Sequence, residues 1–164
     1  MAEAKEEFTF FWKKHSPFSQ WHESSFTVDG MTFNCAEQYM MYQKAVVFND
    51  QEIAEEIQQA KDPITQKKLG RQVKNFDAQI WNEKCREIVK KGNMAKFSQN
   101  AGLKKKLLAT GDTVLVEASP VDRIWGIGLA EDDPRAKDKS QWQGTNWLGY
   151  ALTQVRNELR ENTG

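Results

Sequence analysis

Residues 24–40 read SSFTVDGMTFNCAEQYM, and this stretch decides the fold class. Within it, Asp29-Gly30 separates two runs of β-prone residues, Ser24–Val28 and Met31–Phe33. An Asp-Gly pair in this position predicts a tight β-hairpin, because glycine accepts the positive φ that the turn requires. Asn34-Cys35-Ala36-Glu37 follows at once and has the form of a helix N-cap with a reciprocal acid at its third residue. The chain is therefore expected to change from β to α structure at this point.

The rest of the chain extends the same pattern, with helices in the majority. The first helix is expected to run to about Phe48, and the others follow from apolar spacing and from capping residues. These are a helix carrying Ile53 and Ile57, one opened by Asp62-Pro63 with Leu69 and Val73 inside, one from Asp77 to Gly92, a short basic one over Asn100–Ala109, and one from about Thr145. Phe8–Trp12 and Thr113–Ala118 read as strands. We expect one α+β domain over residues 1–164 (core about 8–161), predominantly helical with a small β-sheet or hairpin.

Charge and cysteine content exclude several classes of protein. Lys+Arg and Asp+Glu both number 23, and this balance argues against a broad nucleic-acid surface, which needs a basic face. The N-terminus carries acids where a signal peptide carries bases, and no apolar run reaches the length of a membrane span. Cys35 and Cys85 form no CxxC pair, and His15 and His22 do not have the spacing of a metal site. A cytoplasmic protein without a metal site is the expectation.

Two carboxylates are candidate functional groups, and each has two interpretations. Glu37 reads as the acid of a capping box, or as a catalytic group that the positive end of the helix dipole keeps ionised. Asp122 reads as a turn residue, or as part of a ligand-binding loop, because an arginine, a tryptophan and two glycines follow it just beyond a buried strand.

Other candidates are equally open when read alone. Arg71 is either a solvated helix residue or a phosphate ligand, to which its planar fork is suited. Trp81 on an apolar helical stripe is normally a core residue, Cys35 reads as a small core residue, and Lys104–Lys106 reads as a solvated face.

Taken together, several segments resemble the NADAR (YbiA-like) family of N-glycosidases. They occur in family order and cover nearly the whole chain. They are Phe11 with Ser16-Pro17-Phe18-Ser19; Phe26; Ala36–Met40 with Lys44-Ala45; Gly70-Arg71 with Val73; Trp81; Glu117-Ala118-Ser119; Asp122; Trp125–Gly128; Gly144; Asn146–Gly149; Ala151-Leu152; and Val155-Arg156. The segments Trp12–His15 and Gln20–His22 depart from the family pattern, which leaves the leaving-group preference open.

The resemblance implies hydrolysis of a C–N glycosidic bond without a metal or organic cofactor. In the best-described members the substrates are phosphorylated ribosylamino-pyrimidine intermediates of riboflavin synthesis, and cleavage releases ribose 5-phosphate. Other members act on ADP-ribose attached to guanine, so nucleic acid is expected only as an ADP-ribosylated substrate. Two alternatives therefore stand beside the riboflavin-type substrate: an ADP-ribosyl hydrolase, and a non-catalytic module that binds ADP-ribose or a related nucleotide.

The resemblance also assigns roles to residues. It implies that Glu37, Asp122 and Trp81 are catalytic, with either carboxylate activating water while the other stabilises the cationic sugar. Lys44 and Arg71 would hold the phosphate, and Trp81 or Trp125 would stack on the base. The full set expected to bind substrate is Ser16, Phe18, Lys44, Arg71, Arg123, Trp125, Gly126 and Asn146.

Overall fold

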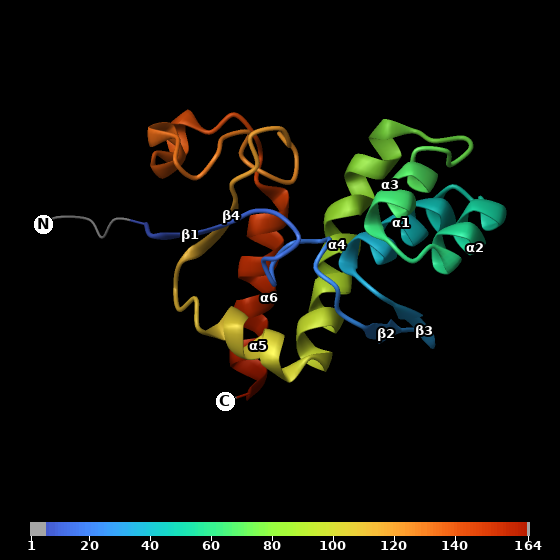
Figure 1. Cartoon of the computed structure of the whole chain (residues 1–164), viewed down its shortest axis with the longest axis horizontal. Helices are drawn as coiled ribbons and strands as arrows, with labels where there is room; N and C mark the ends of the chain where they lie inside the picture. The colour runs from blue at the N-terminus through green and yellow to red at the C-terminus, as the bar shows by residue number, and fades with distance from the viewer. Residues whose placement is uncertain (1–5, 164) are drawn as a thin grey trace, which may run out of the picture. The chain divides into compact units, whose positions relative to one another are not determined.

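The computed structural model describes residues 6–163, and the chain falls into two compact units (Figure 1). One unit is continuous and comprises residues 20–101, whereas the other combines residues 6–19 with residues 102–163. Helices outnumber strands among these elements, which confirms the predicted α+β class.

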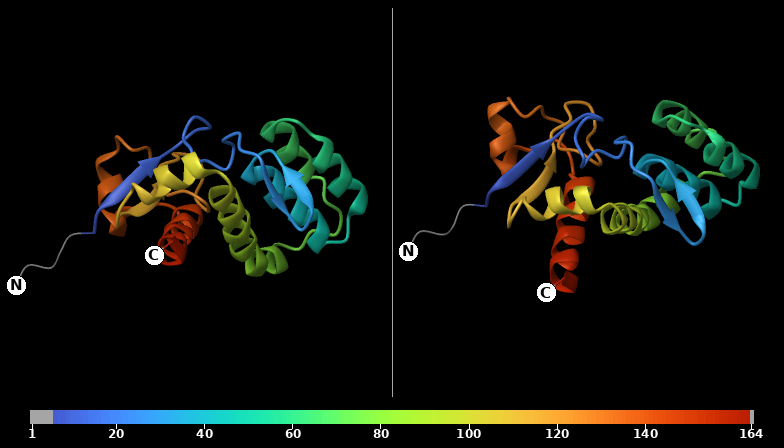
Figure 2. Two further views of the ribbon diagram at one scale, coloured as in Figure 1. Left: turned by 90° about the horizontal axis from the view of Figure 1, so that it is seen from below. Right: turned by 60° about the horizontal axis from the view of Figure 1, so that its bottom comes forward.

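The continuous unit opens with the predicted hairpin. Its strands are β2 (Phe26–Val28) and β3 (Met31–Phe33), which pair antiparallel. Asp29 and Gly30 have φ values of 50° and 81°, so both central residues of the turn lie in the left-handed region that a primed turn requires. Phe26 and Phe33 turn inward and pack against the ring of Tyr39 on the following helix. Figure 2 shows this hairpin from two further sides.

Four helices complete this unit: α1 (Ala36–Val47), α2 (Gln51–Gln59), α3 (Pro63–Gly70) and α4 (Ala78–Gln99). Asp62 and Asp77 cap α3 and α4 as predicted, because each carboxylate accepts hydrogen bonds from the first turn of its helix. The predicted inner face of α3 is only partly right. Gln66 and Gly70 are its buried residues, while Leu69 is half-buried and Val73 lies buried beyond its end.

The predicted end of α4 at Gly92 is wrong. The helix continues through Gly92 for another seven residues to Gln99, and Gly92 serves close packing instead. A Cβ atom on it would lie 2.5 Å from Cδ1 of Tyr39, closer than such contacts allow. The glycine is therefore required by the approach of α4 to α1, which local sequence does not reveal.

This close approach predicts the effect of Gly92→Ala on stability. Alanine favours a helix interior by about 1 kcal/mol over glycine, but overpacking against a buried ring costs about 1–3 kcal/mol. We expect a net loss of up to about 2 kcal/mol in the free energy of unfolding, measured by urea denaturation. Gly102→Ala in α5 is the control, since no described atom lies within 4 Å of its added methyl group. Equal stability of the two variants would contradict the packing role of Gly92.

The second unit is built around a parallel strand pair. β1 (Phe8–Phe11) pairs with β4 (Val114–Glu117), with Phe8 opposite Val114. Both strands were predicted, but their pairing was not, because about a hundred residues separate them in sequence. The helix α6 (Trp147–Thr163) packs against β4 with the predicted buried face, which consists of Leu148, Leu152, Val155 and Leu159.

Short helical segments complete the second unit. The predicted basic helix is α5 (Ala101–Leu108), which begins at the boundary between the units and exposes Lys105 and Lys106. The loop after β4 contains two 3₁₀ turns, η1 (Pro134–Lys137) and η2 (Lys139–Gln141). Within the described residues, no helix is both long enough and apolar enough to span a membrane.

Candidate active site

Glu37 lies in the first turn of α1, and of its two interpretations the structure contradicts the capping box. The N-cap is Cys35 rather than Asn34, so Glu37 is the second residue of the helix. The reciprocal contact comes from Gln38, whose Oε1 accepts the backbone N–H of Asn34 at 2.7 Å. The predicted capping box at Glu37 is therefore wrong, because the helix register is shifted by one residue.

The residues around Gln38 show why a glutamine fits that position better than a glutamate, which has no side-chain donor. Its Nε2 donates to the carbonyls of Ile57, Gln58 and Ala60 at the end of α2, while the Asn34 side chain accepts from Gln66. These amide contacts join α1, α2 and α3. Glu37 is only 4% exposed and lies at a helix N-terminus, where the dipole favours an anion.

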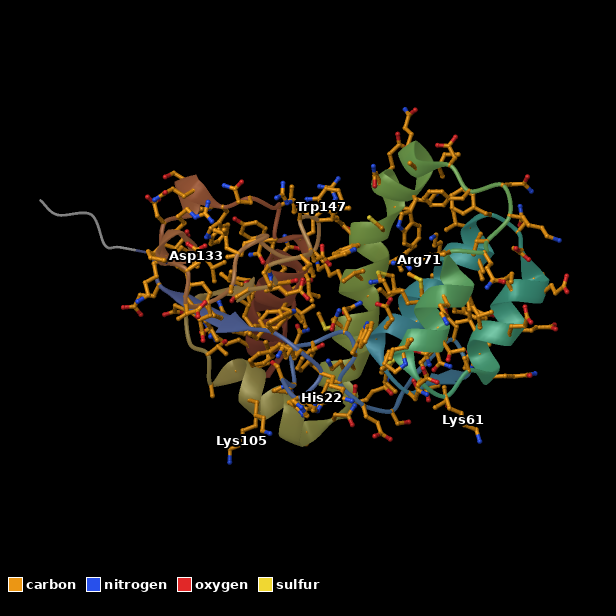
Figure 3. The ribbon with its side chains drawn as sticks, turned by 45° about the horizontal axis from the view of Figure 1, so that its top comes forward. His22, Lys61, Arg71, Lys105, Asp133 and Trp147 are labelled. Carbon is orange, nitrogen blue, oxygen red and sulfur yellow. The ribbon has the colours of Figure 1, made fainter. Side chains whose placement is uncertain are left out.

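Lys44 is brought into the electrostatic range of both Glu37 and Arg71. Burial lowers the pKa of Lys44 below its usual range, while the Glu37 carboxylate raises it and the Arg71 guanidinium lowers it. Arg71 follows the last residue of α3, where it is exposed (Figure 3). The structure thus places three of the predicted site residues in one neighbourhood, with the anion and two cations that a phosphorylated sugar substrate needs.

An aromatic residue that the sequence reasoning missed borders this group. Phe76 has its ring centroid 4.5 Å from Nζ of Lys44 and 5.4 Å from the ring of Phe48, yet remains 46% exposed. A partly exposed ring beside the Lys44 cation is suited to contact a planar base. In the sequence, an aromatic residue just before the Asp77 cap is equally typical of a hydrophobic contact at the start of a helix, so it carried no specific signal.

A second missed residue is Lys96, which is fully buried on α4. Burial lowers the pKa of Lys96 to about 7, and the nearby Cys35 opposes the shift. Burial raises the pKa of the Cys35 thiol to about 11; Glu37 contributes to the rise, and Lys96 counteracts it. The Cys35 Sγ lies 3.1 Å from Oε1 of Gln66, so the thiol is a buried donor rather than a nucleophile. Glu37 and Lys96 thus both lie near Cys35 at the start of α1.

The buried lysine predicts a pH-dependent stability. An unfolded lysine keeps its proton up to about pH 10.4, whereas folded Lys96 loses it above about pH 7. Unfolding therefore takes up a proton between these values, and stability rises with pH. We expect the free energy of unfolding to increase from pH 7 to 8.5, approaching about 1.4 kcal/mol per pH unit, and to lose this slope in Lys96→Met.

Urea denaturation at several pH values measures this slope. Lys91→Met is the matched control, because Lys91 is on the same helix with its side chain 61% exposed. Parallel pH profiles for the wild type and Lys96→Met would contradict the lowered pKa.

Asp122 belongs to the other unit and organises the loop after β4. Its Oδ1 accepts the backbone N–H groups of Ile124 and Trp125, both at 2.9 Å, and its own N–H donates to Ser119 Oγ. The turn interpretation of Asp122 is therefore confirmed. Its catalytic role stays a prediction, since Glu37 and Asp122 lie in different units.

The backbone near Asp122 packs closely against β4. A Cβ atom on Gly126 would lie 2.9 Å from the carbonyl oxygen of Glu117, so only glycine fits there. Asn146 is fully buried, and its amide donates to the carbonyl of Leu115 and accepts from the N–H of Glu117. The observed role of Asn146 is to hold β4 against the start of α6.

The remaining predicted residues divide between the units. In the unit of Asp122, the Ser16 hydroxyl accepts the N–H of Phe18, whose buried ring packs against Phe11. Arg123 is exposed, and the ring of Trp125 lies edge-on to Trp147 at 5.8 Å, where α6 begins (Figure 3). In the unit of Glu37, Trp81 is half-buried in α4 rather than a full core residue. Substrate contacts by all of these residues stay predictions.

The NADAR domain model matches residues 10–160. The chain belongs to the NADAR family. It is 44% identical over 131 residues to Protein irg-1 of Caenorhabditis elegans, covering 79% of this chain and 62% of that protein. It is 42% identical over 149 residues to N-glycosidase R617 of Acanthamoeba polyphaga mimivirus, covering 88% of each.

Two further similarities concern function and fold. Riboflavin biosynthesis protein VVA0006 of Vibrio vulnificus is 31% identical over 150 residues, which is 92% of this NADAR chain and 37% of that protein. The NMR structure of Escherichia coli YbiA matches with a TM-score of 0.79 and 28% identity, covering 98% of this chain and 89% of that one. The predicted family and α+β fold are thereby confirmed, and so is the predicted enzyme class, a hydrolase acting on N-glycosyl bonds.

The grouping of titratable side chains over the described part of the chain differs from that of a metal site. Among residues 6–163, no three His, Cys, Asp or Glu side chains are grouped so that they could hold an ion.

Proposed function

We propose that this NADAR-family hydrolase cleaves the C–N glycosidic bond of phosphorylated ribosylamino-pyrimidines and releases ribose 5-phosphate. The observation that carries the proposal is the neighbourhood of the buried Glu37 carboxylate, Lys44 and Arg71. A carboxylate stabilises positive charge on the sugar, and two adjacent cations suit one phosphate group. The name of the Vibrio relative supports a substrate from riboflavin synthesis.

The chemistry follows from the bond that breaks. As the C–N bond lengthens, its electrons move to the leaving nitrogen, and C1 of the ribose acquires oxocarbenium character. A water oxygen then bonds to C1 and loses one proton to a carboxylate, and one proton is delivered to the nitrogen of the leaving amine, so that the carboxylate is restored over the full cycle. One carboxylate accepts the proton and the other stabilises the cationic sugar. We assign these two roles to Glu37 and Asp122, in either order, with Trp81 or Trp125 stacking on the base.

The phosphate requirement tests this function against its alternatives. We expect kcat/KM for a ribosylamino-pyrimidine 5′-phosphate to exceed that for its dephosphorylated counterpart at least about tenfold, because charged hydrogen bonds contribute about 1.5–3 kcal/mol each. This preference should shrink in Lys44→Met and in Arg71→Met. Lys61→Met, on an exposed residue of the same unit, is the control.

Two results would replace the proposal. Faster release of ADP-ribose from ADP-ribosylated guanine would identify the protein as an ADP-ribosyl hydrolase. Tight binding of either substrate, with the ligand recovered intact after prolonged incubation, would identify a binding module instead.

A further inference from the structure

Two buried amides, Gln20 and Asn93, lie beside the start of α1. The main-chain carbonyl of Gln20 accepts the N–H of Glu37 at 2.9 Å, which fixes Gln20 against the first turn of the helix. The Asn93 Nδ2 on α4 donates to Oε1 of Gln20 at 2.8 Å. Gln20 is 8% exposed and Asn93 is 0% exposed, so both residues are buried.

The hydrogen bonds determine which atom of each amide is left over. Asn93 Nδ2 donates both of its protons, one to Gln20 and one to the carbonyl of Val89 at 2.9 Å. Oxygen and nitrogen cannot be exchanged in either amide without losing these contacts. The remaining atoms are a donor, Nε2 of Gln20, and an acceptor, Oδ1 of Asn93, and neither has a hydrogen-bond partner within residues 6–163.

A buried donor and a buried acceptor without partners are costly, at about 1–3 kcal/mol each, so they indicate a polar group that the fold is built to receive. Each of the two atoms belongs to the same carboxamide group as an atom of the Gln20–Asn93 hydrogen bond, so donor and acceptor are parts of one amide pair. A hydroxyl group accepts one hydrogen bond and donates another, and it matches this pair.

We propose that Gln20 and Asn93 bind a ribose hydroxyl, with Gln20 Nε2 donating to the hydroxyl oxygen and Asn93 Oδ1 accepting its proton. The inference rests on the proposed function, in which Glu37 acts beside the anomeric carbon. Gln20 is hydrogen-bonded to the main chain of Glu37, which acts beside the anomeric carbon. We therefore assign the bound hydroxyl to C2, the ribose carbon next to the anomeric carbon. Hydrogen bonds to this hydroxyl strengthen in glycosyl transition states, so the amide pair also determines sugar specificity.

Binding of ribose 5-phosphate and 2-deoxyribose 5-phosphate, measured by calorimetry, tests the proposal. We expect the wild type to bind ribose 5-phosphate at least about tenfold more tightly, since the deoxy sugar leaves buried polar groups unpaired. The ratio should fall to near one in Gln20→Met and in Asn93→Leu. Gln58→Met is the matched control, because Gln58 Oε1 is also buried without a partner but its Nε2 bonds Thr32, on the hairpin.

Several results would overturn this assignment. They are equal binding of the two sugars by the wild type, binding of neither, or an unchanged ratio in the Gln20 and Asn93 variants, which would indicate an internal water only. If a variant fails to fold by circular dichroism, Gln20→Glu replaces it, since this change keeps Oε1 for Asn93 and removes the donor.

Product analysis on the same preparations separates this inference from the proposed function. Selectivity for ribose 5-phosphate without hydrolysis of any ribosylamine would overturn the function and leave the hydroxyl site standing. Hydrolysis without selectivity would overturn the hydroxyl site alone.

Discussion

Glu37→Gln is expected to lower kcat at least about a hundredfold while leaving the fold intact. Glutamine has nearly the same shape and keeps a side-chain oxygen, so the change removes the negative charge and little else. A positioned acid or base typically contributes a factor of about 10²–10⁴ to the rate. The charge also acts on a neighbour: Glu37 raises the pKa of Lys44, so the variant should bind the substrate phosphate less tightly as well.

The capping contacts make this variant easy to interpret. Gln38 and Asn34 make polar contacts at the start of α1, and neither of these contacts depends on the ionisation of Glu37. Glu52→Gln is the control, because Glu52 is an exposed acid in the first turn of α2. Steady-state kinetics and thermal unfolding of both variants give the comparison. Full activity in Glu37→Gln would remove Glu37 from the mechanism.

Asp122→Asn is expected to have an effect of similar size, about a hundredfold or more on kcat, by the same loss of charge. Asparagine retains the Oδ1 that accepts the N–H groups of Ile124 and Trp125, so the turn is preserved. Asp122→Ala removes that acceptor and should lower stability by about 1 kcal/mol in addition.

The comparison between these two substitutions separates the turn role of Asp122 from a catalytic one. If Asp122 only shapes its loop, Asp122→Asn should be as active as the wild type, and Asp122→Ala alone should be impaired. Asp138→Asn is the control in the same unit, since Asp138 caps η2 through similar contacts to Ser140. Initial rates at saturating substrate are the measurement.

The features that local chemistry controls were predictable from the sequence. The Asp29-Gly30 turn and the capping of α3 and α4 by Asp62 and Asp77 each depend on a few adjacent residues. The buried face of α6 followed from its spacing alone, because a helix against one strand needs a single apolar stripe.

The features that depend on distant contacts were not predictable in this way. Gly92 resembles a helix end, and only the ring of Tyr39 explains why the helix passes through it. Lys96 follows ordinary helical spacing, and its burial depends on how α4 packs against α1. The candidate site was found through Glu37, Lys44 and Arg71, which the family pattern marks, whereas the surrounding amides and Phe76 required the tertiary structure.

The most direct test of the central claim is a time course with the wild-type protein and a ribosylamino-pyrimidine 5′-phosphate, followed by mass spectrometry. Hydrolysis of the C–N bond predicts that the free pyrimidine and ribose 5-phosphate appear together, in equal amounts and over many turnovers, at a rate above the enzyme-free background. Substrate that is bound by the protein but recovered intact, with no ribose 5-phosphate formed above that background, would contradict it.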